Sequence, residues 1–249
     1  MLFNLSFIEL VLSVGAVLLA LTLHEFAHGF VAYKLGDNTA HLMGRLSLNP
    51  LKHLDPFGAI CMVFFHFGWA RPVPINPRNF NHPRRDFALC ALAGPLTNII
   101  LAFFSAFFYL LFKVSYIELA NIDSLPFFVN ACYYLALFFS LLHQINIGLG
   151  IFNLLPIPPF DGSRILYSVL PPKAYFGVMK YERYIYWGVV IWLLGGGYVY
   201  SMLMSIPFIA SNAVLSGISR VFYLSGLISD ATSFLSGLMV KFWLLLPIF

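Results

Sequence analysis

The feature that most constrains this chain is an apolar stretch from Phe7 to Tyr33 that carries two histidines and a glutamate near its end. His24 and His28 are four positions apart. On an α-helix they lie about 40° apart in azimuth and one turn apart along the axis, so both imidazoles can reach one metal ion. Glu25 projects beside them, where a carboxylate can take a proton from water. The alternative is two polar histidines on an ordinary helix, but such residues are costly inside a membrane span and are functional candidates there.

Composition places that stretch in a lipid bilayer. Hydrophobic residues make up 60% of the chain and charged residues 10%, whereas soluble domains carry about 25% charged residues. We therefore expect an all-α polytopic membrane protein with about six transmembrane helices, in contact with lipid over much of its surface. The net charge is +4 and the basic residues form no stripe, so no nucleic-acid partner is expected.

Hydropathy and turn residues divide the chain into a series of helices. The residues before Phe7 include no lysine or arginine, so the first helix is expected to be retained rather than cleaved as a signal peptide. The expected helices cover residues 5–33, 86–112, 127–154, 183–205, 207–228 and 232–248. We expect one integral-membrane domain over residues 1–249, with a catalytic core at about 5–170 and C-terminal helices at about 183–249.

The segment 59–75 is too short for a helical span. It is apolar, β-branched and aromatic, and it is interrupted by Gly68, Pro72 and Pro74. This pattern predicts a small membrane-associated β-hairpin between the first two transmembrane helices. Its open edge is a candidate site for pairing with an unwound peptide substrate.

The distribution of basic residues predicts the orientation in the membrane. Lysines and arginines gather in the segments 34–86 and 164–183, whereas the segment 113–126 holds only Lys113 against Glu118 and Asp123. By the positive-inside rule the N-terminus lies outside the cell, and the histidine pair lies toward the cytoplasmic side.

A catalytic zinc site normally needs a third protein ligand besides two histidines. Asp161 is the strongest candidate, because it follows the segment 156–159, whose prolines break the third helix at the same expected depth as the histidines. An equally weighted alternative is that Asp161 caps the helix that follows. Asn98 and Asn153 are polar residues in apolar helices. Either one is a candidate donor to an oxyanion, although the residues alone favour an interhelical hydrogen bond.

Four motifs in this order resemble the site-2 protease family of intramembrane zinc metalloproteases. They are His24-Glu25-Phe26-Ala27-His28, Gly44-Arg45-Leu46-Ser47-Leu48-Asn49-Pro50, Ala93-Gly94-Pro95-Leu96-Thr97-Asn98 and the stretch from Phe152 through Asn153 and Asp161 to Gly162. The resemblance covers roughly residues 15–170. It implies that His24, His28 and Asp161 bind one Zn²⁺ per chain and that Glu25 is the general base. It also implies that Asn153, and less directly Asn98, contact the substrate or the oxyanion.

The resemblance implies an enzyme that hydrolyses peptide bonds in or near transmembrane segments of membrane-anchored proteins. Many members carry a PDZ or regulatory domain, and the sequence shows neither, so we expect a minimal member in a prokaryotic inner membrane. The competing interpretation is a metal transporter or sensor without proteolytic activity. Glu25 discriminates between them, because a transporter has no need of an uncoordinated carboxylate beside a ligand.

Overall fold

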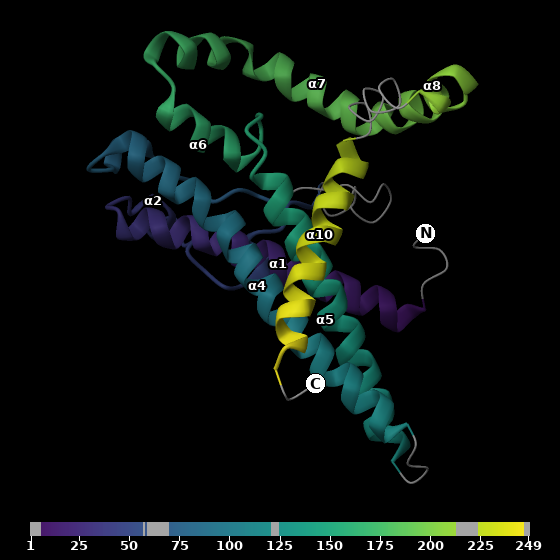
Figure 1. The fold of residues 1–249 in the computed structure, drawn as a ribbon. Coiled ribbons are helices and arrows are strands. Elements are labelled where there is room, and N and C mark those ends of the chain that lie inside the picture. The colour runs from purple at the N-terminus through teal and green to yellow at the C-terminus, as the bar shows by residue number, and fades with distance from the viewer. Residues whose placement is uncertain (1–5, 57, 59–69, 121–124, 213–223, 247–249) are drawn as a thin grey trace.

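The computed structural model describes residues 6–56, 58, 70–120, 125–212 and 224–246. Most of these residues are helical, and long helices run side by side through the centre of the molecule (Figure 1). The elements are α1 (Phe7–Lys34), α2 (Thr39–Leu42), η2 (Pro50–Lys52), η3 (Pro77–Asn79), α4 (Pro83–Leu119), α5 (Pro126–Asn153), α6 (Asp161–Val169), α7 (Pro172–Met204), α8 (Pro207–Ser211) and α10 (Leu224–Leu244).

Three helices are long and apolar enough to cross a membrane, namely α1, α4 and α5. A fourth span results if the two segments of α7 that meet at 51°, 177–192 and 195–204, are counted together. The protein is therefore an integral membrane protein built mainly from helices. The expected fifth span overlaps residues 213–223, which lie outside the described residues. The expected sixth span, 232–248, falls mostly on α10, which is not among the candidate spans. The count of six therefore remains a prediction.

The ends of α1 follow from local chemistry. Ser6 and Glu9 form a capping box, in which each side chain accepts a hydrogen bond from the backbone N–H of the other residue. After Lys34 the chain turns at Gly36, whose φ of 107° is a left-handed conformation that suits glycine. This turn directs the chain toward α2 and ends the first span.

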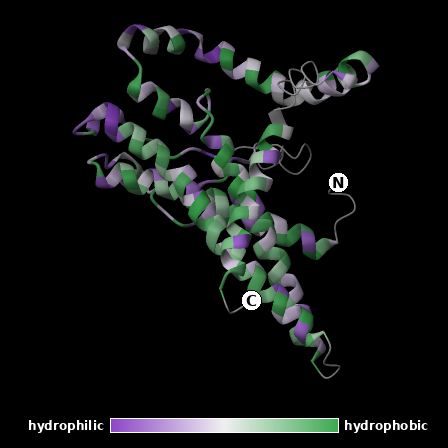
Figure 2. Ribbon diagram, in the orientation of Figure 1, coloured by the Kyte–Doolittle hydropathy of each residue, from purple (hydrophilic) through white to green (hydrophobic). Residues whose placement is uncertain are grey.

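Small residues let the spans pack closely. Ala16 and Ala20 of α1 are fully buried against Leu142 of α5, and α4 contacts both helices. Large apolar side chains remain exposed on the other faces of these helices, among them Val11, Leu96, Ile100, Phe104 and Phe127. Figure 2 shows the hydrophobic colouring along this group of helices, as expected for a surface that contacts lipid.

The predicted β-hairpin falls largely on residues 59–69, which lie outside the described residues. Within the described part, one antiparallel bridge pairs Leu54 with Ala70, and the Arg71 N–H donates to the His53 carbonyl over 2.8 Å. No strand is assigned among the described residues. The hairpin therefore stays a prediction.

Asp37 ties the segment around η3 to the end of α1. Its side chain is fully buried and accepts hydrogen bonds from Thr39, from the Asn76 N–H at 2.7 Å and from Asn79 Nδ2 at 2.8 Å. Burial by itself raises the pKa of Asp37, but these hydrogen bonds outweigh it and lower the pKa below the ordinary value of 3.8. The ionised carboxylate is thus the form that the fold requires.

Replacing Asp37 by Asn should lower the melting temperature of the detergent-solubilised protein at pH 7. The expected loss of stability is about 1.5–3 kcal/mol, because charged hydrogen bonds are lost. A depressed pKa contributes stability above 3.8 that disappears as pH falls through the folded-state pKa. The difference between wild type and Asp37→Asn should therefore shrink below pH 3.8. A difference that is the same at pH 3 and pH 7 would contradict this role.

Candidate metal centre

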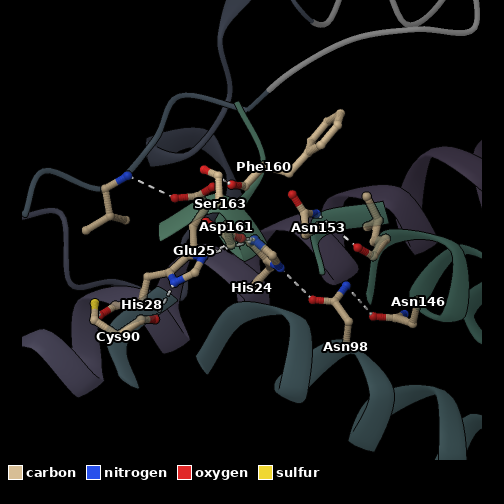
Figure 3. A network of polar contacts seen from close by, with 12 residues as sticks. His24, Glu25, His28, Cys90, Asn98, Asn146, Asn153, Phe160, Asp161 and Ser163 are labelled. Carbon is tan, nitrogen blue, oxygen red and sulfur yellow. Dashed lines mark hydrogen bonds and ion pairs between the residues drawn. The ribbon is translucent and has the colours of Figure 1, made fainter. Parts of the chain in front are cut away.

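Three predicted ligands from distant parts of the chain meet in one place. His24 and His28 project from α1, and Asp161 is the first residue of α6. The two Nε2 atoms are 3.1 Å apart, and Asp161 Oδ2 lies 3.2 Å from each of them (Figure 3). Among the described residues, one group of three histidine, cysteine or carboxylate side chains has its ligand atoms close enough together to hold a metal ion, and it is this one.

The chemistry of these atoms fits zinc. His28 Nδ1 lies 2.8 Å from the Cys90 carbonyl, which can only accept, so Nδ1 carries the proton and Nε2 a lone pair. A proton shared between one histidine Nε2 and the Asp161 carboxylate would form a hydrogen bond between only two of the three converging atoms. A metal cation can accept a lone pair from all three. Ligands at about 2.0–2.1 Å from a tetrahedral zinc lie about 3.3 Å from one another, close to the observed separations. Two imidazoles and a carboxylate also form a known ligand set of catalytic zinc.

Asp161 is the first residue of α6, and its Oδ2 lies 3.2 Å from both histidine Nε2 atoms. The N-cap residue of α6 is Phe160, and within the described residues no side-chain hydrogen bond caps this helix. Of the two sequence interpretations, the geometry therefore favours ligand over cap. The turn also depends on Gly162, because an added Cβ would overlap the backbone carbonyl groups of Leu154 and Leu155. Glycine lets the proline-containing segment fold back tightly enough to present Asp161 to the histidines.

Gly94 of α4 makes room for both imidazoles. An added Cβ would lie 2.6 Å from His28 Cε1 and 2.7 Å from His24 Cε1, far inside van der Waals contact. The sequence places Gly94 in a motif but does not reveal this contact. A glycine inside a helical pattern is a weak indication of close approach.

Glu25 lies in the same buried region, and a backbone N–H group donates a hydrogen bond to its carboxylate. Its Oε2 accepts a hydrogen bond of 2.9 Å from the Val73 N–H. Arg45, from the second motif, fixes the segment before Val73 by donating to the Arg71 carbonyl at 2.7 Å and to the Pro72 carbonyl at 3.2 Å. Sequence reasoning missed this support, because a backbone donor leaves no sequence signal.

The candidate ligands and Glu25 open onto a cavity of about 720 Å³. Its walls are mostly apolar and come from several elements, including Leu21, Val73, Phe152, Phe160 and Val189. Asn153 also lines the cavity, and its Nδ2 donates to the Leu149 carbonyl over 3.0 Å. Asn98 is not among the described residues that line it. Its amide lies instead between His24 and Asn146 (Figure 3).

The class of protein follows from these features. Membrane-embedded metallohydrolases have two histidines one turn apart on a helix, a third ligand beside them and an adjacent glutamate, all within a bundle of apolar helices. The sequence profile of Peptidase family M50 matches residues 12–195. The chain belongs to this family, the site-2 proteases, and is an intramembrane zinc metalloprotease.

Curated relatives agree with this family. Among them are three that bear the name "Putative zinc metalloprotease". YwhC of Bacillus subtilis is 44% identical over 72% of this chain and 76% of its own length. Rip2 of Mycolicibacterium smegmatis is 28% identical over 73% of this chain and 64% of its own length. MJ0611 of Methanocaldococcus jannaschii is 29% identical over 66% of this chain and 73% of its own length. No solved structure matches the chain.

Substitution of Gly94 by Ala should weaken zinc binding without unfolding the protein. The added methyl group must displace one or both imidazoles, and a displaced ligand should weaken zinc binding by about tenfold or more. Gly148→Ala is the matched control, because an added Cβ there meets no atom within 4 Å. Zinc affinity, measured by competition with a chelator, and the melting temperature are the measurements. A Gly94→Ala protein with wild-type zinc affinity would contradict the close packing of α4 on the histidines.

Proposed function

We propose that His24, His28 and Asp161 hold the catalytic zinc and that Glu25 is the general base in hydrolysis of peptide bonds within transmembrane segments. The observation that carries the proposal is the meeting of three ligand atoms at 3.1–3.2 Å, with Glu25 in the same cavity. Zinc, when bound, polarises the scissile carbonyl and lowers the pKa of the attacking water.

The side chains around the cavity perform the remaining steps. Glu25 takes the proton of the attacking water and returns it to the leaving amine. The Val73 N–H, 2.9 Å from Oε2, keeps the carboxylate oriented during both transfers. Asn153 lines the cavity and is positioned to contact the substrate peptide or its developing oxyanion. The mostly apolar walls can accept an apolar substrate segment.

The substrate we propose is a membrane-anchored protein whose transmembrane helix unwinds before cleavage. Its peptide bonds are otherwise hidden in helical hydrogen bonds, and the edge of the hairpin expected at 59–75 would pair with the unwound strand. We also propose one catalytic domain over residues 1–249, six spans, a prokaryotic inner membrane and a site that faces the cytoplasm. The apolar helices and the basic residues at 34–86 and 164–183 support this arrangement.

The role of Glu25 predicts a separation between metal binding and catalysis. Glu25→Gln should keep one zinc per chain but lose cleavage of a single-span substrate in vesicles by at least about 100-fold. Asp161→Ala should lose both zinc and cleavage. Glu118→Gln, at an exposed position near the end of α4, is the control for removing a carboxylate. Wild-type cleavage by Glu25→Gln would exclude it as the base, and full zinc content in Asp161→Ala would exclude it as a ligand.

The proposed orientation can be tested with topology reporters. Alkaline phosphatase fused after residue 120 should be active, because this position follows α4 on the expected outer side. The same enzyme fused after residue 170 should be inactive, since this position lies on the cytoplasmic side. The reverse pattern would overturn the orientation while leaving the proposed chemistry intact.

A further inference from the structure

On the side of His24 away from the cavity, two buried asparagine side chains form a row of hydrogen bonds. His24 Nδ1 lies 2.7 Å from Asn98 Oδ1, and Asn98 Nδ2 donates to Asn146 Oδ1 over 3.0 Å. Asn146 Nδ2 then donates to the Leu142 carbonyl over 2.7 Å. Asn98 is 1% exposed and Asn146 is fully buried, so water does not compete for these bonds. This row of hydrogen bonds joins α1, α4 and α5 (Figure 3).

The Leu142 carbonyl, at the end of this row, fixes the direction of every hydrogen bond in the row. The Leu142 carbonyl can only accept, so the group of Asn146 that faces it must be the NH₂. Asn146 Oδ1 then faces Asn98 and requires the NH₂ of Asn98, which turns Asn98 Oδ1 toward His24. A carbonyl oxygen at His24 Nδ1 requires the ring proton there. His24 Nε2 is left with its lone pair directed at His28 and Asp161.

The two histidines differ in what holds them. His28 Nδ1 meets a backbone carbonyl, that of Cys90, and no side chain is needed to set its tautomer. His24 depends on the Asn98 side chain, and Asn98 in turn depends on Asn146. Both polar atoms of the Asn98 amide are occupied, and Asn98 is absent from the described residues that line the cavity.

We propose that Asn98 and Asn146 form a positioning relay that holds His24 as the Nδ1–H tautomer and aims its Nε2 at the metal. This inference rests on the proposed function, since it takes His24 to be a zinc ligand. It replaces the substrate or oxyanion contact expected for Asn98. Asn146 is a positioning residue that acts only through Asn98. Partners of this kind orient metal-bound histidines, and their loss typically weakens metal affinity by about 10–100-fold.

The test is zinc affinity of the full chain in detergent, measured by competition with a chelator. Asn98→Leu and Asn146→Leu should each weaken zinc binding, by up to about 100-fold for Asn98→Leu. Asn98→Asp loses the donor to Asn146 Oδ1 but keeps an acceptor for His24 Nδ1–H, so it should bind zinc more tightly than Asn98→Leu. Ser105→Ala is the control. It removes another buried side-chain hydrogen bond from α4, that of Ser105 to the Leu101 carbonyl, and should leave zinc affinity unchanged.

A double variant separates a relay from two independent packing effects. Because Asn146 acts through Asn98, Asn98→Leu combined with Asn146→Leu should bind zinc as weakly as Asn98→Leu alone. Losses that multiply would overturn the relay, and so would wild-type affinity in Asn98→Leu. The visible spectrum of the Co²⁺-substituted protein is a second readout. It should change in Asn98→Leu and return toward wild type in Asn98→Asp, and an unchanged spectrum in Asn98→Leu would also overturn the relay.

These outcomes are distinct from failure of the proposed function. If the wild-type protein bound no zinc, or if His24→Ala bound it normally, the proposed site itself would be wrong. If the wild type and Ser105→Ala bound zinc equally and the asparagine variants did too, only the relay would be lost.

Discussion

Two imidazole nitrogens and one carboxylate oxygen converge within 3.2 Å inside a bundle of apolar helices. Gathering such groups away from water is costly, and the cost is offset when a cation is shared among them. Two features of the backbone produce this convergence. α1 supplies the histidines one helical turn apart, and the break after α5 brings Asp161 back to meet them. The bundle around them excludes water from all but the cavity side.

One face of α4 serves as the support for the histidine pair. Cys90, Gly94 and Asn98 are spaced four positions apart, so they follow one another along the helix on the same side. The Cys90 carbonyl accepts from His28, Gly94 provides the space for both rings, and Asn98 accepts from His24. α4 therefore contacts both histidines, while the direction of the Asn98 amide is set in turn by Asn146 of α5. These contacts give a structural role to the motif Ala93–Asn98, which holds no predicted ligand.

Much of this arrangement follows from the sequence, and the remainder has identifiable reasons. The spacing of His24 and His28 is enough to place them on one helix face, and hydropathy finds α1, α4 and α5. The helix ends differ from the predicted ones: α4 extends to Leu119 rather than residue 112, and α7 begins at Pro172 rather than residue 183. In both cases charged residues continue a helix beyond its apolar part. Hydropathy alone reads such residues as loop, although proline is favourable at the first position of α7.

Contacts between distant segments could not be read from the residues. From chemistry alone, ligand and helix cap are equally good interpretations of Asp161, and within the sequence only the family resemblance favours the ligand. The support of Glu25 by the Val73 N–H comes from backbone, which has no residue preference. The direction of the Asn98 amide depends on Asn146 and on the Leu142 carbonyl, both on α5. The spacing of residues along one helix gives no information about such contacts with another helix.

The most direct test of the convergence is anomalous diffraction at the zinc edge from crystals of the full chain. We expect one peak per chain, bounded by His24 Nε2, His28 Nε2 and Asp161 Oδ2, with its remaining side open to the cavity beside Glu25. A peak at any other group of side chains, or zinc held by the histidines with Asp161 turned away, would contradict the proposed centre.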